Sequence, residues 1–479
     1  MFNLRTAMFA FILLALLLLA GRFVKQRSRW CQRLYLPSSI MAGVLGLLLG
    51  PGVLGAIATS MGGEDTLLAG GLFSSDISAV WSQMPGVFIN VVFAALFLGE
   101  SIPAPRDIWR KAAPQVVFGQ TLAWGQYVVG LLVTIVILIP LFDINPMAAA
   151  LIEIGFEGGH GTAGGMVETL SELGFADGGD LALGLATVGI VSGIVCGTAL
   201  ADWGRRKGHV SMLNRDVTEP AEIPDLNVLA ETPEIRQQRA RLLHNLLIDP
   251  LSINAAIVGA AIAVGWLMLE ALKWIESVTW GQAGFALFPF VPLFPLALIG
   301  GIVVQVILNR LGLGSLIIRP MVQNIAGVAL DVLIVAAIAS ISLQVIGANL
   351  GVFLVLSVVG VLWNVLIFLW WAPRVFPTYW FEKGIGDMGQ SMGVTATGIL
   401  LIRMVDSDNH TGAFEGFAYK QLFFEPIVGG GLFTAAAPAL INRLGAGPML
   451  AITSGLLLFW IVVGYSLIRQ ARRPSMGET

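Results

Sequence analysis

IGFEGGHGTAGGM, residues 154–166, is the stretch around which this chain is organised, because it places five glycines among eight residues between two long apolar segments. Each glycine inside an α-helix costs about 1 kcal/mol relative to alanine, so this run disfavours a regular helix. Irregular backbone at membrane depth is tolerated only where protein buries it or where it lines a watery cavity. The stretch therefore predicts bare peptide groups at a binding site.

The composition around that stretch is typical of a membrane protein. Of the 479 residues, 56% are hydrophobic and 12% are charged. Several apolar runs approach the ~20 residues that cross a bilayer. A formal net charge of −3 gives no sign of a nucleic-acid partner. Cys31 and Cys196 lie far apart in sequence and form no CxxC metal motif. We therefore expect an all-α polytopic membrane protein.

The apolar runs predict eleven spans, with two further segments, at about residues 147–166 and 384–402, entering the membrane as re-entrant hairpins. The first run, 6–21, has the length of a secretory signal, but the basic block at 22–33 favours a retained span. With the N-terminus outside and the C-terminus inside, 24 of the 27 Lys and Arg residues lie on the inner side. That bias would collapse if either hairpin were a full span. We expect the first hairpin to open outward and the second to open inward.

Each hairpin follows four spans and precedes a fifth, which is the pattern of two inverted five-span repeats. The predicted layout is a first repeat at 1–201, a polar cytoplasmic linker at 202–249, a second repeat at 250–441, and an extra C-terminal span with its tail at 442–479. Transporters built from inverted repeats bind substrate and ions near the bilayer midplane, where broken helices meet.

Four segments resemble the bacterial sodium/glutamate symporter family: GGHGTAGG (158–165), VGIVSGIVCGTALADWGRRKG (188–208), GQSMGVTATG (389–398) and FFEPIVGGGLF (423–433). The resemblance implies a homodimeric secondary transporter, not an enzyme, in the bacterial cytoplasmic (inner) membrane. It also implies import of L-glutamate with Na⁺ as the coupling ion, by an elevator movement of a core domain against a dimerising scaffold. It implies no covalently bound cofactor.

The first glycine stretch is a candidate site for a substrate carboxylate. Its candidate substrate-binding residues are Gly158, Gly159, His160, Gly161 and Thr162, because helix N-termini and glycine-rich nests bind anions through backbone N–H groups. The alternative is helix packing, for which Gly155/Gly159 and Gly161/Gly165 have Gly-xxx-Gly spacing. His160 is equally compatible with a structural role that fixes the loop.

The second hairpin adds Gln390, Ser391, Thr395, Thr397 and Arg403 as candidate substrate-binding residues. Hydroxyl groups and freed carbonyls supply the oxygen ligands that a dehydrated alkali cation needs. A hydroxyl that bonds back to its own helix is the alternative for each Ser or Thr. Arg403 can pair bidentately with a carboxylate, or it can anchor the inner side of the membrane.

Acidic residues at membrane depth are functional candidates by default. The candidate ligands for a coupling Na⁺ are Glu157, Asp331, Ser391, Thr395 and Glu425. Glu157 adjoins the glycines, and Asp331 lies in the apolar run 325–346. Glu425 precedes Pro426, which we expect to kink a span at 416–441.

Other functions fit part of this pattern. A cation/proton antiporter of related inverted-repeat fold would use Asp331 or Glu425 as its proton carrier, and a symporter of aspartate or another dicarboxylate would differ only in cargo. A channel could be built from glycine loops alone. A membrane-embedded enzyme using His160 with Glu157 is disfavoured, because no nucleophile or HExxH spacing accompanies them.

Overall fold

The computed structural model describes residues 4–28, 37–63, 65–100, 104–210, 237, 249–284, 286–407 and 409–471. The protein is 84% helix, with no strands among those residues, which confirms the all-α class. Most of the predicted linker at 202–249 and the tail after residue 471 lie outside the described residues, as does part of the basic block at 22–33.

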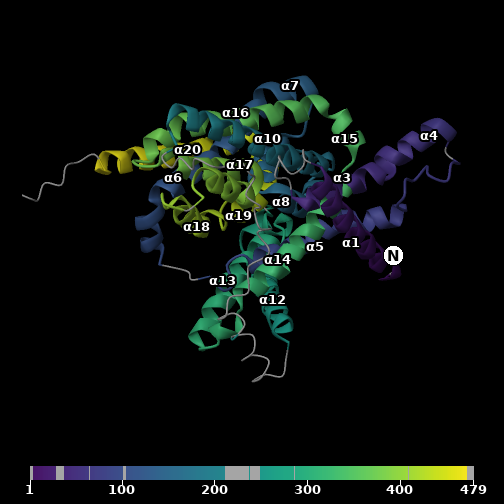
Figure 1. Ribbon diagram of the computed structural model, residues 1–479, viewed down its shortest axis with the longest axis horizontal. Coiled ribbons are helices and arrows are strands. Elements are labelled where there is room, and N and C mark those ends of the chain that lie inside the picture. The colour runs from purple at the N-terminus through teal and green to yellow at the C-terminus, as the bar shows by residue number, and fades with distance from the viewer. Residues whose placement is uncertain are drawn as a thin grey trace, which may run out of the picture. The chain divides into compact units, whose positions relative to one another are not determined.

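Thirteen of the described helices have twelve residues or more (Figure 1). In chain order they are α1 (Leu4–Arg27), α3 (Ser38–Leu49), α5 (Ser75–Ala95), α6 (Pro105–Val133), α10 (Asp177–Lys207), α12 (Pro250–Val278), α13 (Phe294–Arg310), α14 (Arg319–Ala339), α16 (Leu350–Val375), α17 (Trp380–Val405), α18 (Ala413–Phe424), α19 (Leu432–Leu444) and α20 (Ala446–Ala471). The shorter elements are η1 (Pro51–Gly55), α4 (Ala56–Gly62), η2 (Thr134–Leu138), α7 (Ile139–Phe142), η3 (Pro146–Ala150), η4 (Glu153–Glu157), α8 (Gly159–Gly165), α9 (Val167–Glu172), η5 (Trp280–Ala283), η6 (Phe288–Phe290), η7 (Gly314–Leu316) and α15 (Leu343–Ala348).

Local sequence signals explain several helix ends. The side chain of Ser74 accepts a hydrogen bond from the amide of Ile77 at the start of α5, and Asp249 does the same for Ser252 at the start of α12. These are the side-chain caps that satisfy free N–H groups in a first turn. At the other end of α10, Gly208 adopts the left-handed conformation (φ 71°) that closes a helix.

The lengths of the helices are those of a multi-pass membrane protein. Within the described residues, nine helical segments are long and apolar enough to cross a bilayer. The shorter apolar helices α13 and α19 coincide with two of the eleven predicted spans, at 285–308 and 416–441. The segment Arg106–Phe142 combines α6, η2 and α7 into one candidate span.

The chain divides into two compact units that differ from the predicted domains. Unit 1 comprises Met1–Ile102, Gly164–Thr169 and Val217–Gln344, and unit 2 comprises Pro103–Ala163, Leu170–Asp216 and Val345–Thr479. Each unit therefore takes helices from both halves of the sequence. The repeat boundaries at 1–201 and 250–441 stay a prediction. Two repeats can exchange helices when they pack, so the compact units need not coincide with the repeats.

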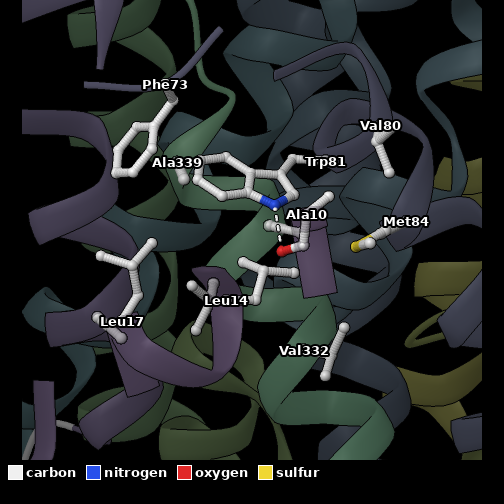
Figure 2. Packing of buried hydrophobic residues seen from close by; sticks show 12 residues of the cluster. Ala10, Leu14, Leu17, Phe73, Val80, Trp81, Met84, Val332 and Ala339 are labelled. Carbon is white, nitrogen blue, oxygen red and sulfur yellow. Dashed lines mark hydrogen bonds between the residues drawn. The ribbon is translucent and has the colours of Figure 1, made fainter. Parts of the chain in front are cut away.

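Unit 1 is held together by apolar packing between helices that are neighbours in the chain and between α5 and α14, which are distant in sequence. α12 packs against α13, α5 packs against α14, and α1 packs against α3 (Figure 1). Figure 2 shows the cluster where α1, α5 and α14 meet around the buried indole of Trp81. The indole nitrogen donates to the carbonyl of Ala10 (3.1 Å), and the ring of Phe73 meets the indole edge-on at 4.8 Å. The indole therefore contributes both packing and a satisfied polar group.

Unit 2 contains a helical hairpin where the second re-entrant segment is predicted. α17 is interrupted at Gly393 (φ −147°) and Val394 (φ 59°, ψ 177°). A Cβ placed on Gly398 would lie 2.5 Å from the carbonyl oxygen of Gly386, although a straight helix would separate twelve residues by about 18 Å. The two halves of α17 therefore fold back on each other. Entry of this hairpin into a membrane from one side stays a prediction.

The first glycine stretch differs from expectation. The prediction of no regular helix is wrong for Gly159–Gly165, which form α8. The break lies at its first residue, Gly159, which has φ +66°. Glycine serves close packing here, because a Cβ on Gly155 would lie 2.8 Å from Leu185 in α10 and one on Gly164 would lie 2.3 Å from Pro85. The helix-packing alternative therefore holds for Gly155.

The predicted kinked span at 416–441 is also wrong as a continuous helix. α18 ends at Phe424 and α19 begins at Leu432, and the connection between them includes Gly429 and Gly430 with φ of 72° and 100°. Left-handed backbone of this kind is available to glycine and interrupts a helix more completely than Pro426 alone would.

The Trp81 cluster yields a stability prediction. Trp81→Ala should lower the free energy of unfolding by about 3–5 kcal/mol, because it leaves a cavity among α1, α5 and α14. The matched control is Trp266→Ala on α12, where the side chain is 52% exposed. Thermal unfolding in detergent measures both. Equal losses in the two variants would contradict the packing role assigned to Trp81.

Candidate functional site

Two helix breaks meet inside unit 2. A Cβ placed on Gly159 would lie 2.3 Å from Cγ1 of Val394, so the break at the start of α8 touches the break in α17. α10 closes in at the same place, since a Cβ on Gly189 would lie 2.2 Å from the carbonyl oxygen of Met392. A β-branched residue with positive φ, such as Val394, is strained by about 1–3 kcal/mol, and such strain concentrates at functional sites.

Glu153 is a structural acid next to this point. Its side chain is fully buried and accepts hydrogen bonds from the Tyr127 hydroxyl (2.6 Å), the Thr434 hydroxyl (2.7 Å) and the Gly429 amide (2.8 Å). Three donors satisfy the carboxylate and tie η4 to α6 and to the connection before α19. We therefore assign Glu153 a structural role, in which its hydrogen bonds hold neighbouring elements together.

Glu157, four residues further on, is buried without such partners. It is 2% exposed, and neither carboxylate oxygen has a hydrogen-bond donor among the described residues. The fully buried Ser391 hydroxyl, on the hairpin just before its break, likewise has no hydrogen-bond partner among the described residues. Burying a carboxylate without a partner is costly. The geometry therefore calls for a cation or a proton at Glu157.

The glycine stretch holds two more buried polar atoms that lack partners among the described residues, Oγ1 of Thr162 and Nδ1 of His160. Nε2 of His160 lies 2.9 Å from the Thr187 hydroxyl, which itself donates to the carbonyl of Leu183. Because that hydroxyl hydrogen is used, the network assigns the His160 proton to Nε2. Nδ1 is then an acceptor that can receive a hydrogen bond.

Lys420 is a functional candidate that sequence reasoning missed. Its side chain, on α18, is fully buried, with Nζ 3.1 Å from Oδ1 of Asp387 and 2.5 Å from Oε1 of Gln390. In the sequence it was counted only among the basic residues of the inner side, and its complete burial was not predicted. The available signal was a lone lysine within the aromatic run 417–424.

A hydrogen-bond network links Lys420 to the hairpin break. Gln390 donates through Nε2 to Gln421 (3.1 Å) and towards Glu425 (3.4 Å). Thr395, directly after the break, donates to Glu425 (3.2 Å) and accepts from Gln421 (2.9 Å). The structure therefore brings together Gln390, Thr395 and Glu425, three residues predicted from sequence.

The chemistry of this site is that of hard oxygen ligands. No group of three or more His, Cys, Asp or Glu able to hold a metal ion occurs in the described part of the chain. Carboxylate, hydroxyl and amide oxygens suit a small alkali cation better than a transition metal. The broken helices supply carbonyls and amides in addition.

A family model described as sodium/glutamate symporter matches residues 115–406. The chain belongs to the sodium/glutamate symporter family. Members of this family are transporters. The match includes the first glycine stretch, α10 and the whole α17 hairpin of this symporter. Lys420 and Glu425 lie beyond the matched segment. Comparison with curated proteins and comparison with solved structures each give no match.

Three other predicted site residues of the symporter lie apart from this network. The Thr397 hydroxyl donates to the carbonyl of Gly393 (2.6 Å), so the alternative of bonding within its own helix holds there. Arg403 is exposed on the second half of α17. Asp331 is half-buried on α14, in unit 1 rather than unit 2. Gly158 and Gly161 lie in the glycine stretch, where Gly161 is buried and Gly158 half-buried.

The contact between the two breaks yields a prediction for the symporter. Gly159→Ala should destabilise unit 2 by more than Gly174→Ala, because both residues have positive φ (66° and 87°) but only Gly159 faces a neighbour. The backbone strain costs about 1–2 kcal/mol in each, and overpacking against Val394 adds about 1–3 kcal/mol for Gly159 alone. Thermal unfolding midpoints measure the difference. Identical midpoints would show that the two breaks do not touch.

Proposed function

We propose that this protein imports L-glutamate, or a closely related acidic amino acid, together with Na⁺ by alternating access. The observation that carries the proposal is Glu157, a buried carboxylate without a hydrogen-bond donor among the described residues, beside the meeting point of two helix breaks. Membership of the sodium/glutamate symporter family supports sodium and glutamate as the cargo.

The proposed Na⁺ site centres on Glu157. The hydroxyls of Ser391 and Thr162 are candidates for further ligands, since both are buried and have no hydrogen-bond partner within the described residues. Oxygen ligands of this kind replace the water that an alkali cation loses on binding. Glu425 with Thr395 forms a second candidate cation site. Asp331 in unit 1 keeps the role of a sequence-based candidate.

The proposed substrate site uses backbone and histidine. The second half of α17 begins at Thr395, and the N-terminal end of a helix favours a carboxylate. Backbone groups of Gly158, Gly159 and Gly161 are candidates for the same purpose. Nδ1 of His160 is an acceptor suited to a substrate ammonium group. Gln390 and Arg403 stay candidates for the side-chain carboxylate.

Charge sets the order of events. Within the described residues, Lys420 is the positive charge that interacts with the three acids Glu157, Asp387 and Glu425. An anionic substrate would meet net negative charge, so we expect Na⁺ to bind first.

The membrane potential bounds the number of coupling ions. Moving one negative charge into a cell with a negative interior costs ~2.3 kcal/mol per 100 mV. Because glutamate carries net charge −1, uptake driven by the membrane potential needs at least about two cations.

The arrangement in the membrane is part of the proposal. The basic-residue bias supports an N-terminus outside and a C-terminus inside the bacterial cytoplasmic membrane. The family resemblance supports a homodimer with an elevator movement. Unit 2 contains the candidate cation and substrate ligands other than Asp331, so we assign the transport core to unit 2.

Uptake by purified protein in liposomes tests the function. Labelled glutamate should accumulate with an inward Na⁺ gradient, and Glu157→Gln should lower the apparent Na⁺ affinity at least about tenfold, the equivalent of losing roughly 1.4 kcal/mol of cation binding. Glu172→Gln, which changes an exposed acid on α9, is the matched control and should behave as the unaltered protein.

Three outcomes would contradict this proposal. Uptake without Na⁺ would remove the coupling ion, and Na⁺ movement that responds to pH but not to any amino acid would favour a cation/proton antiporter. Unaltered Na⁺ affinity in Glu157→Gln would move the ion site elsewhere. Preference for aspartate or another dicarboxylate would change the cargo and leave the mechanism in place.

A further inference from the structure

The buried ammonium group of Lys420 is surrounded by oxygen atoms and aromatic rings. Two oxygens contact it, Oδ1 of Asp387 at 3.1 Å and Oε1 of Gln390 at 2.5 Å. Two aromatic rings complete the surroundings, with the centroid of Phe424 at 4.1 Å and that of Phe417 at 5.1 Å. Lys420 and Asp387 are both fully buried. Carboxylate, amide oxygen and ring face are together the surroundings that a desolvated monovalent cation prefers.

The fold makes room for this lysine. A Cβ on Gly119 of α6 would lie 2.8 Å from Cδ of Lys420 and 3.1 Å from Nζ, so a side chain at residue 119 would collide with the lysine stem. The Lys420 side chain therefore packs closely between α6 and the hairpin, and this packing holds its ammonium group in place. Its position is fixed by packing as well as by charge.

Removing the ammonium group would leave the Asp387 carboxylate buried without a partner. Neither oxygen of Asp387 has a conventional hydrogen-bond donor in the described structure apart from the ion pair with Lys420. Lys420 also interacts electrostatically with Glu157 and Glu425. Without it, three carboxylates would share one buried region with no positive charge, which is strongly unfavourable.

Lys420 also orients the residue that faces the proposed ion site. Because Oε1 of Gln390 accepts from Lys420, Nε2 of Gln390 must point towards Gln421 and Glu425. This settles the amide orientation of Gln390 from the network. A cation at the Lys420 position therefore acts on the network that reaches Thr395 and the hairpin break.

We propose that Asp387 and Gln390 form a monovalent-cation site that Lys420 fills with a tethered ammonium, so that the protein carries one built-in cation in place of one coupling ion. The proposal rests on the Na⁺-coupled function above. The tether supplies positive charge without competing for external Na⁺, and it leaves Glu157 and Glu425 for the mobile ions. Deleting the ammonium should open the Asp387 site to Na⁺ from solution.

Sodium binding by purified protein, measured with radioactive Na⁺ at equilibrium, tests the proposal. Lys420→Met keeps most of the side-chain length and removes the charge, and it should bind one more Na⁺ per chain than the unaltered protein. The matched control is the double variant Lys420→Met/Asp387→Asn, which removes both charges and should return to the unaltered number. Thermal unfolding of Lys420→Met should also gain a steeper dependence on Na⁺ than on choline.

Two results would overturn the proposal. One is a folded Lys420→Met that binds no extra Na⁺ and gains no Na⁺-dependent stability, since Lys420 would then only neutralise Asp387. The other is a Lys420→Met that cannot be recovered folded at any Na⁺ concentration, with or without recovery of the double variant, because no mobile ion would then replace the ammonium. Failure of the proposed function is a separate result, because the unaltered protein would then show no Na⁺ binding and no Na⁺-driven uptake.

Discussion

The structure depends on the contact between two helix breaks in a buried polar region of unit 2. Gly159 and Val394 come close enough that a single methyl group on Gly159 would collide, and both lie in left-handed backbone. Breaking two helices frees peptide groups that must find partners away from water. The surrounding acids, amides and hydroxyls supply polar surroundings for those groups, and this makes a site for ions possible inside an apolar protein.

The buried acids of this region divide by their partners rather than by their depth. Glu153 accepts three hydrogen bonds and holds elements together, whereas Glu157 has no donor for either oxygen within the described residues. Asp387 is neutralised by Lys420, and Glu425 shares a network with Thr395, Gln390 and Gln421. These four buried carboxylates of unit 2 thus differ in the groups around them, and those groups decide which of them is left without a partner in the protein.

The sequence predicted the class of the fold and much of the candidate site for clear physical reasons. Apolar runs of bilayer length and a strong bias of basic residues report directly on a membrane protein. Dense glycine drew attention to 158–165 and 384–402, and each segment contains a break in the backbone, at Gly159 and at Gly393–Val394, although Gly159–Gly165 form a helix. Glu157 and Glu425 were found because acids are rare in apolar segments.

The rest depended on tertiary packing. Lys420 was counted only among the basic residues of the inner side, because a basic residue ordinarily lies at a membrane surface, and its burial depends on an ion pair with Asp387, more than thirty residues earlier. Arg403 was predicted either to pair with a carboxylate or to anchor the inner side of the membrane, and in the structure its side chain is exposed. The glycines of α8 are explained by tertiary contacts, because Gly159 lies against Val394 and Gly164 against Pro85, where a larger residue would collide. Units that mix both halves of the chain cannot be read from local patterns.

The most direct test of the central claim is an experimental structure of the protein in Na⁺ and glutamate. We predict a Na⁺ ion coordinated directly by an oxygen of Glu157, with Gly159 and Val394 in contact beside it. A Glu157 carboxylate paired with a protein donor, or a Na⁺ ion bound only in unit 1, would contradict it.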